Sequence, residues 1–247
     1  MSSNALYLLH TQPNPQRLAA WAVRHRLLDA QGDLGYALHA LLHAAFGDQA
    51  PQPFCYLDAE QGLLAYTRLS PTELAQCAAL TAPDAAAALG LGQTLHHAGM
   101  NARPFPMLWP AGHVLGFEVR VRPIVRECKT GRERDAFLAA VEKSGGAELN
   151  RSMVYVQWLR ELLARQGGAE LVEASVTRYQ LLGVTRKGQK DSGTDARQSR
   201  LVTGPDAVLE GQLRVLDPQA FAQLLATGVG RHRAFGFGML LLRSLRA

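Results

Sequence analysis

The stretch that decides the fold lies close to the end of the sequence and reads GVGRHRAFGFG, residues 228–238. Four of these eleven residues are glycine, and Arg231, His232 and Arg233 lie between the two Gly-x-Gly pairs. Glycine lets a backbone turn tightly and lets a bulky ligand approach it. Successive N–H groups in such a turn form a concavity for an anion, and arginine adds planar donors that match phosphate oxygens. The stretch predicts a phosphodiester-binding loop, and a plain glycine-rich turn fits the same composition.

The flanks of this stretch decide which phosphate ligands are excluded. Asp217-Pro218 is typical of a helix start, Gly228 of a helix stop, and the apolar run 237–242 of a closing strand. A dinucleotide loop runs from a strand into a helix, and a Walker loop ends in Gly-Lys-Ser/Thr, so neither class fits. No Asp or Glu follows Asp217, so we expect nothing local to neutralise the nearby arginines. These are Arg231, Arg233, Arg243 and Arg246.

Composition limits the class of protein. A chain of 247 residues suits one large domain or two compact ones, and its net charge of +5 favours a polyanionic partner. The three cysteines show neither zinc spacing nor a disulfide framework, which indicates a reducing cytoplasm. The first residues do not resemble a signal peptide, and no apolar run approaches the length of a membrane span. We therefore expect a cytoplasmic protein that does not contact membranes.

The order of predicted elements indicates the fold class. From His113 onward the pattern predicts strand, helix, strand, strand, helix, strand, which is the ferredoxin-like βαββαβ unit. The elements are expected at residues 113–126, 153–165, 171–184, 208–216, 217–225 and 237–242. The first half predicts a strand at 5–9, helices at 17–28 and 34–46, strands at 54–57 and 63–66, and a short helix from 71. Residues 82–112 show no clear period.

We therefore predict an α+β protein of two tandem ferredoxin-like domains, residues 1–112 and 113–247. A helix at 136–141 falls within an added segment, 132–152, which we interpret as a helical insert of the C-terminal half and a candidate RNA-binding arm.

Two further segments are basic. Residues 120–134 hold six Arg or Lys and two Glu, and the cationic residues are Arg120, Arg122, Arg126, Lys129, Arg132 and Arg134. Residues 185–200 form a polar stretch that includes Lys187 and Lys190, which we interpret as a loop that a partner orders. Both segments are candidate nucleic-acid contacts, and a solvated strand face is the plain alternative for the first.

The predicted helix at 34–46 separates two kinds of side chain. At 100° per residue the apolar positions gather on one side, namely Leu34, Leu38, Leu41, Leu42 and Ala45. Tyr36, His39 and His43 fall on the opposite side, so these histidines are not expected in the core. An exposed pair, a metal pair and a catalytic surface all fit this spacing. The metal alternative lacks the Glu of a zinc-protease motif and any further ligand cluster.

These pieces fit one kind of chemistry. RNA carries its own nucleophile, the 2′-hydroxyl. A protein needs only to align it with the adjacent phosphate, take its proton and stabilise the charge that develops. Histidine suits the proton step near neutral pH, tyrosine can hydrogen-bond or donate, and arginines can cover the charge.

Four motifs carry a resemblance to a known family. They are EGQLRV (210–215) with Asp217-Pro218, GVG (228–230) and AFGFGML (234–240); FEVRVRP (117–123) with KTGR (129–132); VQWL (156–159); and Tyr36-x-x-His39. With these motifs the chain resembles the CRISPR-associated repeat endoribonucleases of the RAMP superfamily, and most of all the CasE (Cse3) group of type I-E systems. The resemblance covers most of residues 34–46 and 113–242.

The resemblance implies cleavage of CRISPR precursor RNA within repeat hairpins, without a metal or cofactor, leaving a 5′-hydroxyl and a 2′,3′-cyclic phosphate. It also implies that the product is retained in a complex with other CRISPR effector subunits. By the same resemblance His39 is the acid and base, and Tyr36 is its companion. The predicted RNA-binding residues are Gly228, Gly230, Arg231, His232, Arg233, Gly236, Gly238 and Arg243, with Arg120, Arg122, Arg126, Lys129, Arg132, Arg134, Lys187 and Lys190.

The sequence also departs from the family pattern. An Arg24-His25-Arg26 cluster precedes Tyr36, and residues 47–112 match poorly. Divergent repeat endonucleases, including those of type IV systems, do not all use a histidine, so Arg24, Arg26 or Arg243 would then stabilise the transition state. Two rival functions also fit the sequence: a non-catalytic RNA-binding subunit of the same complex, and an enzyme that binds a small phosphate compound.

Overall fold

A computed structural model describes residues 5–27, 34–92, 99–127, 131–145, 147–187 and 199–245. The first half builds a four-stranded antiparallel sheet in the order β2-β3-β1-β4. Its strands are β1 (Leu6–Thr11), β2 (Phe54–Asp58), β3 (Gly62–Thr67) and β4 (Asn101–Phe105). With helices between the first and second strands and between the third and fourth, this is the ferredoxin-like arrangement.

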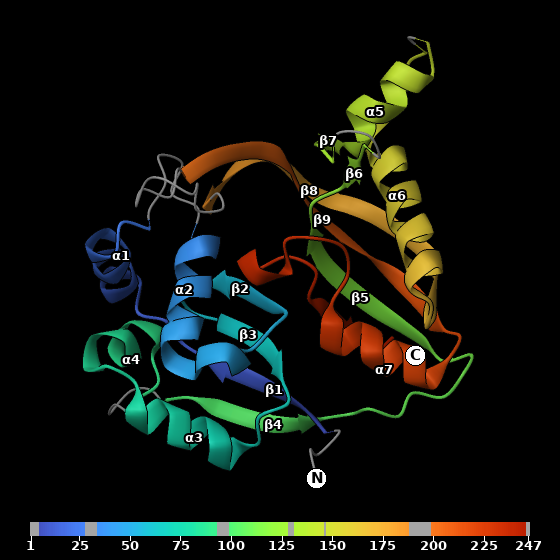
Figure 1. The fold of residues 1–247 in the computed structure, drawn as a ribbon. Helices are drawn as coiled ribbons and strands as arrows, with labels where there is room; N and C mark the ends of the chain where they lie inside the picture. Colours follow the sequence, from blue (N-terminus) through green and yellow to red (C-terminus); the bar gives the residue numbers. More distant parts are fainter. Residues whose placement is uncertain are drawn as a thin grey trace.

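Helices pack against this first sheet (Figure 1). They are α1 (Pro15–Arg24) and α2 (Gly35–Phe46), then the 3₁₀ turn η1 (Gly47–Gln49), then α3 (Pro71–Leu80) and α4 (Pro83–Leu89). The predicted short helix at 71 is confirmed, and its start is fixed by a capping box between Ser70 and Glu73. Helix α4 and strand β4 occupy the region that showed no period.

The second half repeats the arrangement with the sheet order β10-β5-β9-β8. Its strands are β5 (Val114–Val121), β8 (Ala169–Lys187), β9 (Ser199–Val215) and β10 (Leu240–Arg243), with helices α6 (Arg151–Gln166) and α7 (Pro218–Thr227). The prediction of two tandem ferredoxin-like units is confirmed by this repeated order. The proposed division at 112/113 falls between β4 and β5 and stays a prediction.

The added segment of the second half begins earlier than predicted. The single strand expected over 113–126 is wrong: β5 ends at Val121, and β6 (Ile124–Arg126) pairs instead with β7 (Glu133–Asp135). Pro123 has no N–H to donate to a continuing ladder, which accounts for the break. Helix α5 (Ala136–Lys143) follows, so the insert contains a small hairpin as well as a helix, and it projects away from both sheets (Figure 1).

The strands of the second half also differ in length from the prediction. The expected polar loop at 185–200 is too long, because residues 185–187 extend β8 and residues 199–200 begin β9. The two strands pair from Ala169↔Val215 to Lys187↔Ser199. Residues 188–198, which include Lys190, lie outside the described residues. The closing strand begins at Leu240 rather than at 237.

Helix α1 stops before the position predicted from its apolar period. It ends at Arg24, and Arg26 adopts a left-handed conformation with φ of 55°. The N–H of Leu27 bonds to Ala22 O at 2.9 Å and that of Arg26 to Val23 O at 3.0 Å. This pair of bonds is a Schellman ending. The sequence concealed it, because arginine stands where glycine normally marks such an ending.

The two halves share part of their core. Tyr66 of β3 is buried and donates its hydroxyl to Leu240 O of β10 at 2.9 Å. One continuous apolar cluster includes Leu6, Cys55 and Tyr66 of the first half together with residues of β5, α6, β9 and α7. This joint places the glycine-rich stretch beside α2 (Figure 1).

Candidate active site

Helix α2 presents its two sides as the sequence predicted. Leu38, Leu41 and Leu42 are buried in the core of the first half. Tyr36, His39 and His43 lie on the other side and are half-buried. The imidazole rings of His39 and His43 are 4.5 Å apart in an edge-on arrangement, and the rings of Tyr36 and His39 are 6.3 Å apart. One helical surface therefore holds three proton-handling side chains.

The glycine-rich stretch meets this surface. It contains the 3₁₀ turn η2 (Arg233–Phe235). The centroid of the Phe235 ring lies 5.8 Å from the ring centroid of Tyr36 and 5.5 Å from that of His39. The two regions that the sequence singled out, nearly 200 residues apart, are therefore in direct contact. Phe235 itself was not among the predicted site residues, although it stands inside the quoted stretch.

The surroundings of His39 change its pKa. Burial, assisted by the neighbouring His43 charge, lowers the pKa of His39 from its ordinary value of 6.5 to about 4. An imidazole with this pKa is neutral at neutral pH and has a lone pair available. His39 is therefore in the state that a general base requires.

The glycines themselves have a structural explanation. The N–H of Val229 bonds to Gly238 O at 2.8 Å, and that of Gly238 bonds to Arg120 O of β5 at 2.7 Å. Gly238 has φ of 79°, and a Cβ there would lie 2.2 Å from Val229 O. Gly228 has φ of 77°, and a Cβ there would meet Gly238 O at 2.9 Å. The plain-turn alternative thus accounts for both glycines, and these N–H groups of Val229 and Gly238 serve the turn.

Distant carboxylates neutralise the arginines that the sequence left without partners. Glu133 of β7 accepts from Arg231 Nε at 2.9 Å and contacts His232 Nε2 at 3.0 Å. Arg243 pairs with Glu118 and, at 3.4 Å, with Glu210. The acids that neutralise Arg231 and Arg243 are distant in the sequence, on β5, β7 and β9, so the lack of local acids gave no sign of these ion pairs.

The predicted RNA contacts of the glycine-rich stretch differ in their exposure to solvent. Arg231 remains 47% exposed, and Arg233 is exposed and donates to Thr227 O at 2.6 Å. His232 is buried with φ of 61°, so its assignment as a surface contact is corrected: in this conformation it joins the loop to Glu133. Roles of the loop residues in binding RNA stay predictions.

The arginines of the predicted basic strand, Arg120 and Arg122, are also paired or buried. Arg120 forms a two-bonded ion pair with the buried Asp206, at 2.9 Å for each bond, and lies 4.4 Å over the Phe237 ring. Arg122 is only 2% exposed and donates to Leu182 O at 3.3 Å. The expectation of a surface contact is corrected for Arg122, because its side chain is inside the protein. The solvated-face alternative also fails for both arginines.

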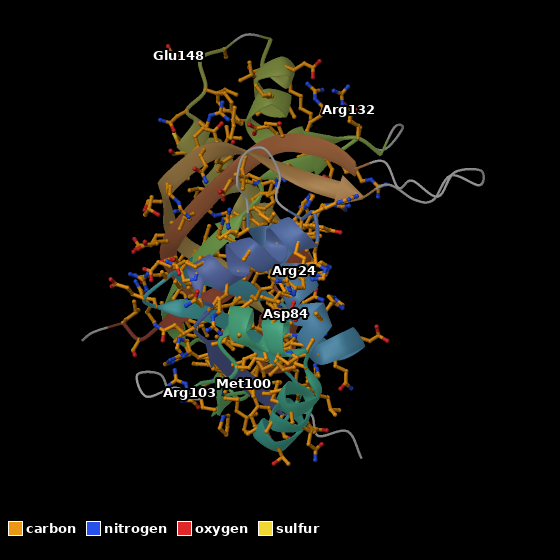
Figure 2. The ribbon with its side chains drawn as sticks, turned by 90° about the vertical axis from the view of Figure 1, so that its left-hand side faces the viewer. Arg24, Asp84, Met100, Arg103, Arg132 and Glu148 are labelled. Atoms are coloured by element: carbon orange, nitrogen blue, oxygen red, sulfur yellow. The ribbon has the colours of Figure 1, made fainter. Side chains whose placement is uncertain are left out.

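The remaining basic candidates lie on the insert or outside the described residues. Arg126 donates to Gly131 O, Arg134 pairs with Glu142 at 2.7 Å, and Arg132 is exposed (Figure 2). Lys129 and Lys190 lie outside the described residues. Lys187 ends β8, and its side chain is also outside what the structure describes.

Arg24 and Arg26, the alternative catalytic residues, lie at the end of α1. Arg24 is exposed and pairs with Asp84 of α4 at 2.8 Å (Figure 2). Arg26 is exposed in its left-handed conformation. The ion pair ties Arg24 to α4. Of these four described residues, Tyr36 and His39 are the ones whose ring contacts join them to the glycine-rich stretch.

Within the described ranges, no three His, Cys, Asp or Glu side chains gather into a group that would hold a metal ion. Independence of metal stays a prediction. Among the helices of the described part of the chain, none has the length and apolar character needed to cross a membrane.

The fold and site together define a class: a tandem ferredoxin-like protein whose early helix presents tyrosine and histidine to a C-terminal glycine-rich turn. The family model described as CRISPR associated protein matches residues 6–244. The chain therefore belongs to this family of CRISPR-associated proteins, which confirms the resemblance found in the sequence.

Solved structures share the fold at low identity. A CRISPR endoribonuclease Cse3 bound to a 19-nucleotide RNA is 22% identical, with 97% of this chain and 99% of that chain covered and a TM-score of 0.61. Thermus thermophilus Cse3, bound to an RNA representing a pre-cleavage complex, is 22% identical over 97% and 99% of the chains, with a TM-score of 0.57. A chain of a CRISPR RNA-guided surveillance complex is 17% identical over 98% and 100%, with a TM-score of 0.55. No curated protein matches the chain.

Proposed function

We propose that this protein is a metal-independent endoribonuclease that cuts CRISPR precursor RNA within its repeat hairpins. The observation that carries the proposal is the contact of Phe235 with Tyr36 and His39, which joins the helix and the glycine-rich turn into one site. Membership in the CRISPR-associated family and a fold shared with Cse3 endoribonucleases supply the substrate class.

The chemistry uses the RNA's own nucleophile. The neutral imidazole of His39 takes the proton of a 2′-hydroxyl, and the 2′-oxygen attacks the adjacent phosphorus. The bond from phosphorus to the 5′-oxygen breaks, and that oxygen receives one proton, so the ends are a 2′,3′-cyclic phosphate and a 5′-hydroxyl. Tyr36 is the companion that hydrogen-bonds the phosphate or supplies this proton. Arg231 and Arg233 lie on the same turn and attract the phosphates that flank the site.

The proposal also includes what happens to the cleaved RNA after the reaction. One chain of similar fold belongs to a CRISPR RNA-guided surveillance complex. By analogy, the mature CRISPR RNA stays bound and carries the protein into an effector complex with other subunits. The reaction belongs in the cytoplasm, where the free thiols of Cys55 and Cys77 remain reduced.

Cleavage of repeat RNA in EDTA tests the proposal. We expect a 5′-hydroxyl product from unmodified RNA, and none from RNA with a 2′-deoxy nucleotide before the scissile phosphate, although that RNA still binds. His113→Ala is the matched control for His39→Ala, because His113 is exposed at the start of the second sheet. Tight hairpin binding without product at any protein excess would reject the enzyme and leave the non-catalytic RNA-binding subunit.

The arginine alternative predicts a different pattern. If Arg24 and Arg26 carry the catalysis, Arg24→Ala with Arg26→Ala abolishes cleavage and His39→Ala leaves its rate unchanged. Our proposal predicts the reverse, because His39 and not Arg24 contacts the glycine-rich turn.

A further inference from the structure

A pocket of about 320 Å³ opens beside the proposed catalytic residues. Its walls come from both halves of the molecule: α2 and β2 from the first, and β5, β8 and η2 from the second. The side chains used in the argument are Leu38, Phe54, Tyr56, Arg120, Gln180 and Phe235.

The pocket and the catalytic surface share residues. Phe235 lines the pocket and also contacts the rings of Tyr36 and His39. A group bound in the pocket is therefore a close neighbour of whatever His39 and Tyr36 act upon.

The lining suits a flat aromatic group better than an anion. Tyr56 and Phe235 supply partly exposed aromatic surface, and Leu34 and Leu182 supply further apolar wall. Phe54 and Leu38 are buried. The guanidinium of Arg120 is already held by both oxygens of Asp206, so its charge is offset. The offset charge of Arg120 attracts a phosphate only weakly, whereas a planar ring gains stacking and burial.

One polar group is fixed in a defined orientation. Gln180 Nε2 donates to Asp206 Oδ2 at 2.7 Å. Although burial opposes ionisation, the hydrogen bond and charge of Arg120 hold the pKa of Asp206 below its ordinary value, so its carboxylate only accepts. The amide nitrogen of Gln180 must therefore face Asp206, and its carbonyl Oε1 is the end that remains to accept from a ligand.

We propose that this pocket binds one unstacked nucleobase of the RNA, from a nucleotide that flanks the scissile phosphate, and that Gln180 Oε1 accepts a hydrogen bond from an N–H of that base. The proposal rests on the proposed RNA cleavage and adds to it the means by which the strand is placed in register. Single-stranded RNA is recognised in this way elsewhere, with bases stacked on aromatic side chains and read at their edges.

Abasic RNA tests the pocket with the unaltered protein. Repeat RNAs are made without the base at one or the other nucleotide that flanks the scissile phosphate. Because stacking of one base contributes about 1–3 kcal/mol, we expect one of the two to be cleaved about 5- to 150-fold more slowly at limiting protein. Equal rates for both abasic RNAs and the intact RNA would overturn the proposal.

Gln180→Leu tests the hydrogen bond. We expect about a tenfold loss with intact RNA and no further loss when that base is replaced by purine, which has no N–H on its pairing edge. Gln157→Leu is the matched control, because Gln157 also donates to a carboxylate, Glu161 at 3.0 Å, but on the exposed side of α6. Additive losses from Gln180→Leu and the purine would show that Gln180 acts only on the protein's structure.

Binding separates the failure of this proposal from the failure of the proposed function. With uncleavable 2′-deoxy RNA, the pocket predicts weaker equilibrium binding of the abasic strand, whether or not the protein cuts RNA. If the protein does not cleave RNA but binds the abasic strand more weakly, the proposed nuclease function is rejected and the base-binding pocket is retained. If cleavage is normal and removal of the base changes neither rate nor binding, the pocket is rejected and the nuclease function is retained.

Discussion

The two ferredoxin-like halves have the same strand order but carry different kinds of polar side chain near the candidate site. In the first half, the surface of α2 that faces the glycine-rich turn carries Tyr36, His39 and His43, with no Asp, Glu, Lys or Arg on the helix itself. In the second half, the strands β5, β7 and β9 and the glycine-rich turn carry ion pairs, such as Arg120 with Asp206 and Arg231 with Glu133. In the proposed reaction, the first half supplies proton transfer and the second half supplies charge and position. Substitutions in the two halves should therefore change different measured quantities.

The largest effect is expected from the first half. His39→Ala removes the proposed general base and should lower the cleavage rate at saturating protein by about 10²- to 10⁴-fold, with nearly unchanged hairpin affinity. Single-turnover cleavage and equilibrium binding measure the two quantities. A rate equal to that of the His113→Ala control would contradict the role of His39.

The exposed arginines of the turn should affect binding instead. Arg231→Ala with Arg233→Ala should weaken hairpin binding and reduce the slope of log affinity against log salt by about 0.7–0.9 for each lost phosphate contact. Arg165→Ala is a control from the exposed end of α6. An unchanged salt slope would show that neither arginine meets a phosphate.

A substitution that loosens the turn in contact with α2 is expected to have an intermediate effect on the cleavage rate. Glu133→Gln removes the charge that holds both Arg231 and His232 of the turn carrying Phe235. Phe235 should then be less well placed against His39, and we expect a loss of about tenfold in cleavage rate. Glu142→Gln, which breaks the exposed pair with Arg134 on the same insert, is the control and should change the rate less than twofold.

That loosening also has a pH signature. If Phe235 withdraws, burial of His39 decreases and its pKa rises from about 4, so the acid limb of the rate profile moves to higher pH in Glu133→Gln. A slower reaction with an unmoved limb would mean that Glu133 stabilises the fold without positioning the turn.

The smallest effect is expected within α2. The charged form of His43 lowers the pKa of His39, so His43→Gln should raise the pKa of His39, which stays below 6.5 because burial remains the larger cause. The free protein needs His39 unprotonated, so its activity is lost as pH falls through this pKa. The acid limb of kcat/KM should lie near pH 4 in the unaltered protein and shift upward in the variant. A wild-type limb near 6.5 would contradict the burial of the functional imidazole.

The sequence predicted what depends on local periodicity. The two sides of α2 followed from the spacing of Leu38, Leu41 and Leu42, and the order of elements was sufficient for the ferredoxin-like fold. The close pairing of α2 with the turn was a hypothesis from function, and the ring contacts of Phe235 give it a geometry.

The rest depended on contacts between distant residues. Glu133 and Arg231 are separated by 98 positions, and Arg120 and Asp206 by 86, so no local pattern shows that these charges are paired. The burial of Arg122 was hidden for the same reason, because its environment is built by β8 and β9. The early end of α1 was missed because Arg26 takes a conformation usually left to glycine.

The central claim is that the outward side of α2 and the glycine-rich turn hold the same ribose and phosphate. A structure of the protein with uncleavable 2′-deoxy repeat RNA measures this directly. We expect the 2′-carbon of the nucleotide before the scissile phosphate to lie next to His39, with a neighbouring base between Tyr56 and Phe235. A scissile phosphate bound on another surface, such as the end of α1 at Arg24 and Arg26, would contradict it.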